Sequence, residues 1–394
     1  MALLEKHLNI LDYTLAGLWR KKGKNAAVVT VFAAVIFMLA SFQLVGSALT
    51  AFSRNVLLTA PEITVQRLVA GRQESLPLAY AEKLRRIYGI REIAPRIWGY
   101  YFDERNGANY TVQGMDPAAA TARTLAASLG SGRFLPGEAA GEVVLGQGVA
   151  EALDLQGRTV FSFFRPDLSL KSLVVTGGFS PASAMLTHDL VAMSLADARD
   201  LFRLPADQAT DLLVSVANPK EIANIAKKIA EQLPDCRVLT RNQIQKTYQV
   251  IFGWRSGFAS ICLLTALAAF VILSWDKASG MSPEEKREIG ILKILGWETA
   301  DVLASRFWEG FILAAVAFLV GFLLAYAHVL YFDASLFAPM LIGWSVIKPP
   351  LHLVPQVHLA DILLLASFSV LPYLAATVIP AWRSAAIPPE SAVR

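Results

Sequence analysis

The residue types that most often carry out catalysis or bind metals are few in this sequence, and they match no catalytic pattern. The chain has two cysteines and five histidines, but it contains no HExxH, GxSxG or GxxxxGK[ST] motif. Cys236 lies in a polar region and Cys262 in an apolar run, so a disulfide between them is not expected. We therefore predict no catalytic site, no metal site and no bound cofactor.

Two stretches in the middle of the chain resemble functional motifs only loosely. The segment "GQGVAEALDLQG" follows the strand-like "EVVL", but Gly146, Gly148 and Gly157 do not have the spacing of a GxGxxG phosphate loop. We interpret it as a tight turn that leads into a helix. His188 next to Asp189 is interpreted as a surface-loop residue rather than as half of a catalytic pair.

Two further histidines, His352 and His358, lie six residues apart in a proline-containing loop. Such a pair could bind a metal or haem. Ordinary loop residues are the favoured interpretation, because this spacing is not a recognised ligand pattern.

The densest group of charges lies in "SPEEKREIGILKILG", residues 282–296. Ser282 is a suitable N-cap, Pro283 suits the first helical turn, and Gly296 is a stop signal, so we predict a helix from 283 to about 295. At 100° per residue, Lys286, Gly290 and Lys293 share one narrow stripe. Five apolar residues fill a wide arc beside it: Ile289, Ile291, Leu292, Ile294 and Leu295.

Two interpretations of this helix stay open. It could lie at the inner face of a membrane with its stripe toward the cytoplasm, where Gly290 would leave a flat surface for another protein. It could equally be an interfacial helix that only braces a helix bundle.

Two charged residues, Arg255 and Glu309, lie inside apolar segments. Snorkelling to a nearby interface is the favoured interpretation, and a buried polar pair or substrate contact is the alternative. They lie near opposite ends of their segments, so we do not expect them to pair with each other.

The elements that position these residues are those of a membrane protein. The 394 residues are 55% hydrophobic and 17% charged, and the mean hydropathy is +0.46. The formal net charge of +4 does not suggest nucleic-acid binding. Four segments reach the roughly 20 residues needed to cross ~30 Å of hydrocarbon as a helix. They are residues 26–52, 254–274, 307–332 and 361–381.

The distribution of lysine and arginine predicts the orientation. Basic residues precede the first span and fill the connection between the second and third, whereas the loop between the third and fourth has one, Lys348. We therefore expect the segments 1–25, 275–306 and 382–394 to be cytoplasmic. The segments 53–250 and 333–360 are then expected outside, in a protein of the cytoplasmic (inner) membrane with both termini in the cytoplasm.

The polar segment 53–250 is large enough to bury a core of its own. Short strand-like runs alternate with helical stretches without a strict βαβ rhythm, which predicts an α+β domain. The glycine- and proline-rich stretch from Gly130 to Gly141 predicts a boundary between two lobes.

The charged helix and the apolar segment after it resemble the cytoplasmic signature of the FtsX/MacB/LolC family of ABC transporter permeases. Within "EEKREIGILKILGWETADVLASRFWEGF" the family pattern R-E-I-G-I-L-K-A-L-G is met from Arg287 to Gly296, with Ile294 for the usual alanine, and Glu309 comes later. The tail "PAWRSAAIPPESAVR" resembles the family's closing motif, with departures at Ser384 and Val393. "EVVLGQGVAEALDLQGRTV" is similar to the family's periplasmic core.

The resemblance implies a MacB-like core domain at 53–250 and an FtsX-like permease domain at 251–394, within an α-helical membrane protein of one plus three spans. It implies a separate ABC ATPase subunit, a second permease copy as homodimer partner, membrane lipid around the spans, and an optional periplasmic adaptor or outer-membrane channel. It also implies coupling to the ATPase through seven residues: Lys286, Arg287, Glu288, Ile289, Gly290, Lys293 and Gly296.

Two function classes are implied by the resemblance. The first is export or extraction of a hydrophobic or amphiphilic cargo, such as a lipoprotein, peptide, lipid, haem or drug. The second is signalling, in which the outer domain switches an extracytoplasmic partner such as a cell-wall hydrolase. An outer domain of about 200 residues favours the first, and a membrane-bound enzyme is disfavoured because no catalytic motif is present.

Overall fold

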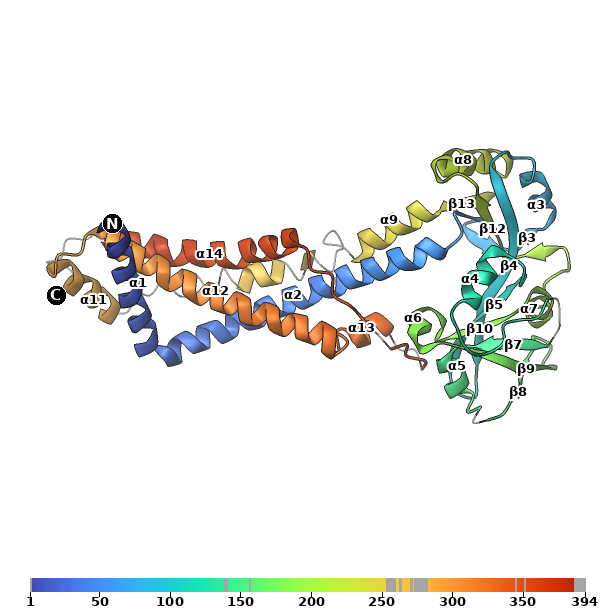
Figure 1. Ribbon diagram of the computed structural model, residues 1–394, viewed down its shortest axis with the longest axis horizontal. Helices are drawn as coiled ribbons and strands as arrows, with labels where there is room; N and C mark the ends of the chain where they lie inside the picture. Colours follow the sequence, from blue (N-terminus) through green and yellow to red (C-terminus); the bar gives the residue numbers. More distant parts are fainter. Residues whose placement is uncertain are drawn as a thin grey trace. The chain divides into compact units, whose positions relative to one another are not determined.

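The computed structural model describes residues 2–137, 141–155, 157–252, 260–261, 264–269, 272, 283–343, 346–350 and 352–385. The chain forms two compact units (Figure 1). The first contains residues 1–50, 250–335 and 353–394, and the second contains residues 51–249 and 336–352.

The first unit is helical. Its main helices are α1 (Ala2–Arg20), the greater part of α2 (Lys22–Thr59), α11 (Pro283–Ile294), α12 (Thr299–Tyr331) and α14 (Leu359–Ala385). Within the described residues, three helices are long and apolar enough to cross a membrane: Lys22–Leu57, Thr299–Tyr331 and Leu359–Ile379. They contain most of the first, third and fourth predicted spans. The second predicted span, 254–274, lies mostly outside the described residues, so the count of four stays a prediction.

Small residues allow these three helices to approach closely. A Cβ added to Gly321 of α12 would lie 2.6 Å from the Ala33 carbonyl oxygen of α2. A Cβ on Gly310 would lie 2.7 Å from Thr377 Oγ1 of α14. Such contacts are typical of membrane helices, which gain van der Waals packing where lipid provides no hydrophobic driving force.

The second unit is built on one large sheet and a second sheet of two strands. Its strands are β1 (Ile63–Val69), β2 (Arg72–Glu74), β3 (Leu76–Pro77), β4 (Ile90–Asp103), β5 (Ala108–Met115), β6 (Leu129–Gly132), β7 (Glu142–Leu145), β8 (Val160–Phe164), β9 (Leu170–Phe179), β10 (Leu190–Ser194), β11 (Gln208–Ala209), β12 (Asp211–Val216) and β13 (Cys236–Thr240). Eleven strands of the described residues form the large sheet. Nine of them follow the order β13-β1-β12-β4-β5-β10-β7-β9-β6, while β2 pairs with β1 and β8 pairs with β9.

The helices of this unit are short. They are α3 (Ala79–Leu84), α4 (Ala120–Ala126), α5 (Gln147–Ala152), η1 (Pro181–Ser183), α6 (Ala184–Thr187), α7 (Leu195–Phe202), η2 (Pro219–Glu221), α8 (Ile222–Gln232), α13 (Ala338–Ile342) and the start of α9 (Arg241–Phe252). Alternate residues of the central strands enter two cores. Val143 and Leu145 join one buried cluster and Val144 the other, because successive strand side chains point to opposite faces.

The predicted division into two lobes near Gly130 to Gly141 is not confirmed by the sheet. Strand β10, which comes after this stretch, pairs in parallel with β5, which precedes it, and antiparallel with β7. One sheet therefore continues across the expected boundary. A pairing between distant segments leaves no local sequence signal that a turn-rich stretch could reveal.

A segment from beyond α12 completes this unit. Ile347 is only 5% exposed and belongs to the larger buried cluster. A Cβ on Gly148 of α5 would lie 2.5 Å from both Ile347 Cγ2 and the His188 ring, so the glycine makes room for both side chains. The loop between the third and fourth predicted spans thus contributes to the core of the outer domain.

Candidate functional site

Helix α11 carries the charged motif, and it ends where the sequence predicts. It covers Pro283–Ile294, and Gly296 lies just beyond it with φ +94°, a conformation that favours glycine. The Trp297 amide donates to the Leu292 carbonyl (3.0 Å) and the Gly296 amide to that of Lys293 (3.1 Å), which is a Schellman termination. Ser282 and the side chain of Lys286 lie outside the described residues.

The orientation of α11 differs from the expectation. Ile289 is 3% exposed and packs with Val302 and Trp297, and its neighbour Gly290 is buried as well. Gly290 therefore does not leave an open surface for another protein in this conformation. The apolar arc is split, because Ile291, Ile294 and Leu295 are 47%, 67% and 72% exposed.

Helix α1 packs against α12 and is an element that the sequence did not lead us to expect. Thr14 Oγ1 lies 2.9 Å from Ser305 Oγ of α12, and Lys6 Nζ lies 2.8 Å from Asp301 Oδ1 at the start of α12. Ile10 and Thr14 are buried, one helical turn apart. A pattern of Ile10, Tyr13, Thr14, Gly17 and Leu18 at spacings of three and four was the available signal.

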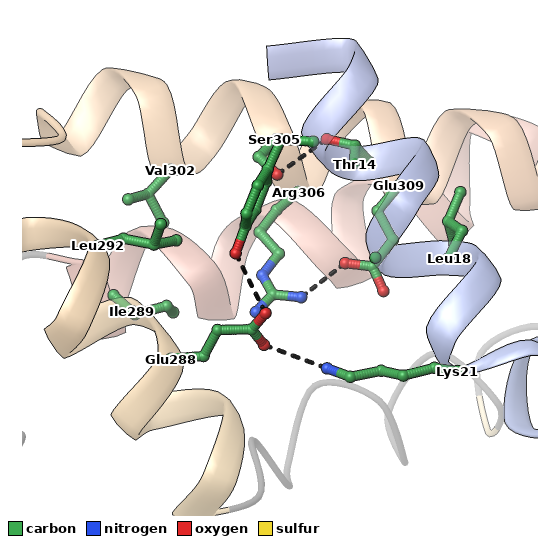
Figure 2. Close-up of a pocket in the computed structure, with 12 residues that line it drawn as sticks. Thr14, Leu18, Lys21, Glu288, Ile289, Leu292, Val302, Ser305, Arg306 and Glu309 are labelled. Atoms are coloured by element: carbon green, nitrogen blue, oxygen red, sulfur yellow. Dashed lines mark hydrogen bonds and ion pairs between the residues drawn. The ribbon is translucent and has the colours of Figure 1, made fainter. Parts of the chain in front are cut away.

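Glu288 of α11 lies at the centre of a group of donors (Figure 2). The Tyr13 hydroxyl donates to its Oε1 (3.2 Å), Lys21 Nζ donates to its Oε2 (3.1 Å), and Arg20 Nη2 lies 3.7 Å from Oε1. Glu288 thus connects the motif helix to α1 and to the Lys21 turn that separates α1 from α2. We call this cluster of α1, α11 and the start of α12 the helix joint.

The charges of the joint fix the protonation state of its members. Partial burial pushes the pKa of Glu288 up, but the hydrogen bond and positive charge of Lys21, the charge of Arg306 and the Tyr13 hydroxyl hold it below its usual value of 4.5. Burial and the adjacent Glu288 carboxylate raise the pKa of Tyr13. Glu288 is therefore an ionised acceptor and Tyr13 a protonated donor at neutral pH.

Glu309, the second predicted acidic residue, pairs on its own helix. Arg306 Nη1 donates to Glu309 Oε2 at 2.6 Å, and the two side chains are 19% and 21% exposed. The polar-pair alternative for Glu309 thus has a partner in Arg306. Arg255 lies outside the described residues.

The joint contains a partly open cavity of about 40 Å³, lined by residues that include Tyr13, Glu288, Arg306 and Glu309 (Figure 2). That volume admits one or two waters, since a water occupies about 30 Å³ in the liquid. It cannot hold a nucleotide or a drug-sized cargo. The arrangement is a polar connection between helices rather than a ligand site.

The remaining coupling residues lie around the joint without entering it. Arg287 is exposed, Lys293 is half-buried, and Gly296 is an exposed turn residue. The structure thus brings Glu288 and Ile289 together with α1 and α12, whereas Arg287 and Gly296 face outward.

The weaker candidates have structural explanations. Gly146 leads from β7 into α5, as the predicted turn requires. His188 is not a surface residue: it is 7% exposed beneath Gly148, and Asp189 accepts from Thr111 Oγ1 (2.6 Å). His352 and His358 are exposed. The part of the chain that is described contains no group of three or more potential metal ligands.

Comparison with known proteins places these observations in a family. The MacB-like periplasmic core domain matches residues 26–232, and the FtsX-like permease C-terminal domain matches residues 256–389. A comparison with curated proteins found no match.

Solved structures similar to the outer domain have low sequence identity. The periplasmic region of MacB from Actinobacillus actinomycetemcomitans is 11% identical, with a TM-score of 0.35, covering 47% of this chain and 91% of that one. The extracellular domain of the noncanonic ABC-type transporter YknZ from Gram-positive bacteria is 12% identical, with a TM-score of 0.35, covering 45% and 99%. Because the core-domain match spans more than half of the 394 residues and the permease match covers most of the rest, the chain belongs to the FtsX/MacB-like family of ABC transporter permeases.

Proposed function

We propose that this chain is the permease subunit of an inner-membrane ABC transporter, in which ATP hydrolysis by a separate subunit drives a conformational change of the outer domain. The change exports or extracts a hydrophobic or amphiphilic cargo. The working assembly contains two permease copies, each with four spans, with both termini and α11 in the cytoplasm.

The observation that carries the proposal is the two-sided character of α11. One side is anchored, through Glu288 to α1 and through Ile289 to Val302 of α12. The other side presents Ile291, Ile294 and Leu295 to solvent, at the spacing of a helix that docks into an apolar groove. A helix that is exposed on one side and anchored on the other suits a contact through which the ATPase displaces the permease.

The anchored side suggests how the push is passed on. Lys21, which holds Glu288, is the turn residue immediately before α2, and α2 continues into the chain of the outer domain. Val302, which packs on Ile289, lies in the first turn of α12. A displacement of α11 is therefore transmitted to two apolar helices at once.

The test removes the bare apolar side. Ile294→Asp with Leu295→Asp is compared with Leu8→Asp, an exposed leucine (52%) on α1 that is not in the motif. A candidate ABC ATPase subunit is reconstituted with each chain in lipid nanodiscs, and binding and ATP hydrolysis are measured. We expect the double variant to lose ATPase binding at least tenfold while the control keeps it. Unchanged binding and stimulation by the double variant would instead favour a helix that only braces the bundle against lipid.

The same reconstituted system distinguishes transport from the second function, in which the chain switches an extracytoplasmic partner. Hydrolysis that rises when candidate amphiphilic cargoes are added supports transport. Hydrolysis that is indifferent to cargo but required for a wall hydrolase to act supports signalling.

A further inference from the structure

A second concave site lies in the outer domain, at one end of the sheet. It is a cleft of about 640 Å³ lined by residues from the ends of four neighbouring strands and from α4. Glu62 precedes β1, Arg91 is near the start of β4, Val216 ends β12, and Arg241 comes directly after β13. These strands are adjacent in the order β13-β1-β12-β4, so their ends meet at one edge of the sheet. The volume is within the range of small-molecule sites, roughly 300–1,000 Å³.

Three arginines contribute to this cleft, and two of them have no partner among the described residues. Arg91 and Arg123 line it, are exposed, and make no side-chain hydrogen bond or ion pair within that part of the chain. Arg241 donates through Nη2 to Glu62 Oε1 (3.0 Å) and to the Ala60 carbonyl oxygen. Its Nε is buried and has no hydrogen-bond partner in the residues that the structure describes.

The two carboxylates of the cleft are engaged elsewhere. Glu62 Oε2 accepts from the Val216 amide (3.3 Å) in addition to the Arg241 pair, and Glu92 Oε1 accepts from the Ala120 amide (3.2 Å) at the start of α4. These contacts join strand ends and a helix start, so they hold the walls of the cleft. Neither carboxylate forms an ion pair with the guanidinium group of Arg91 or Arg123 in the described chain.

Like charges brought into one concavity repel each other, and a concave low-dielectric wall strengthens their combined field. The guanidinium fork matches the geometry of a phosphate group and binds it through paired hydrogen bonds. We propose that this cleft binds the phosphate of an organic phosphate ester, with Arg91 and Arg123 as its principal contacts and Arg241 as the third.

The size of the cleft distinguishes this ligand from a small inorganic ion. A volume of about 640 Å³ leaves room for the organic group beside the phosphate. Two sources share this chemistry, namely the headgroup of an anionic phospholipid and a soluble phosphate ester. The proposal goes beyond the transport cycle, because binding is a property of this chain without an ATPase.

The experiment measures binding to the full chain in a neutral, phosphate-free detergent by titration calorimetry. The probes are sn-glycerol 3-phosphate, dihexanoyl phosphatidylglycerol below its micelle concentration, and inorganic phosphate. The test variant is Arg91→Gln with Arg123→Gln. The control is Arg86→Gln with Arg158→Gln, which removes two exposed arginines that do not line the cleft.

We expect the native chain to bind at least one phosphate ester, and the test variant to bind it at least tenfold more weakly, about 1.4 kcal/mol. The control variant should bind normally, and both variants should keep the native melting temperature, because the substituted side chains are exposed. Tighter binding of the phosphatidylglycerol identifies the lipid source, and tighter binding of glycerol phosphate the soluble source.

Four outcomes overturn the proposal. They are the absence of binding of either ester to the native chain at millimolar concentration, equal binding by the test variant, an equal loss in the control variant, and binding of inorganic phosphate alone. In the last case the cleft would not recognise an ester.

Discussion

The helix joint and the arginine cleft both gather charged side chains, but they treat them in opposite ways. In the joint, one carboxylate, Glu288, is surrounded by donors from Tyr13, Lys21 and Arg20. In the cleft, Arg91 and Arg123 have no acceptor in the described part of the chain.

This difference separates two uses of charge. A satisfied cluster around a cavity of about 40 Å³ has no capacity for a ligand, so its interactions serve to connect helices. In the open cleft of about 640 Å³, Arg91 and Arg123 would be stabilised by an anion that binds there. Two substitutions test the comparison directly. One reverses the charge of Glu288 in the joint, and the other removes the carboxylate that pairs with Arg241 in the cleft.

The largest effect is expected from Glu288→Lys. The new ammonium group would lie beside Lys21, Arg20 and Arg306, so attraction between α11 and α1 becomes repulsion. We expect stimulation of the ATPase to fall at least tenfold in reconstituted complexes. The charge exchange Glu288→Lys with Lys21→Glu should restore much of it. Asp12→Asn, an exposed acid on α1, is the control for lost charge.

A structural measurement shows whether the joint itself has opened. Thr14→Cys and Ser305→Cys replace hydroxyls that lie 2.9 Å apart, in a chain whose Cys236 and Cys262 are changed to serine. Disulfide formation should be efficient when Glu288 is present and poor in the Glu288→Lys variant. Equal crosslinking in both would show that Glu288 does not hold α1 against its neighbours.

The second prediction concerns Glu62, the carboxylate that holds Arg241 in the cleft. Glu62→Gln removes the negative charge beside the arginines, so affinity for a phosphate ester should rise about threefold to tenfold. The same change weakens the bonds to Arg241 and the Val216 amide, and should lower the free energy of unfolding by about 1–3 kcal/mol. Calorimetric titration and thermal unfolding measure the two effects. A fall in affinity would mean that Glu62 positions Arg241 for binding.

Features that are encoded by neighbouring residues in the sequence could be predicted. The end of α11 is encoded by Gly296, whose φ of +94° suits glycine, and it was predicted. The three described apolar helices could be predicted in the same way, because a run of about twenty consecutive apolar residues is recognisable from composition alone.

Orientation and long-range pairing could not be predicted. Helical periodicity gives the angle between Lys286, Gly290 and Lys293 but not the side on which a neighbour lies, so the burial of Gly290 could not be foreseen. The pairing of β5 with β10 had no local signal for the same reason. The arginine cleft joins residues 62, 91, 123 and 241, which no motif connects.

The third prediction uses Gly296, at the end of the motif helix. Its Cβ position is open, so Gly296→Ala meets no neighbour, and only the positive φ resists the substitution. The cost should be about 1 kcal/mol of unfolding free energy, appearing as fraying of α11. Hydrogen exchange of the Gly296 and Trp297 region measures it, with Gly23→Ala, a glycine in α2 with open space and no positive φ, as the control.

The smallest effect is the pH dependence of the joint. The pKa of Glu288 is held below 4.5 in the folded chain, so its ionised form stabilises the contact above pH 4.5, and this contribution is lost as the pH falls through the lowered value. Partly exposed ion pairs contribute about 0–1 kcal/mol each, so the change in crosslinking of the Thr14→Cys and Ser305→Cys pair should be modest. It should be absent in Glu288→Gln, in which no carboxylate titrates at this position. A pH dependence that persists in that variant would show that Glu288 is not the group responsible.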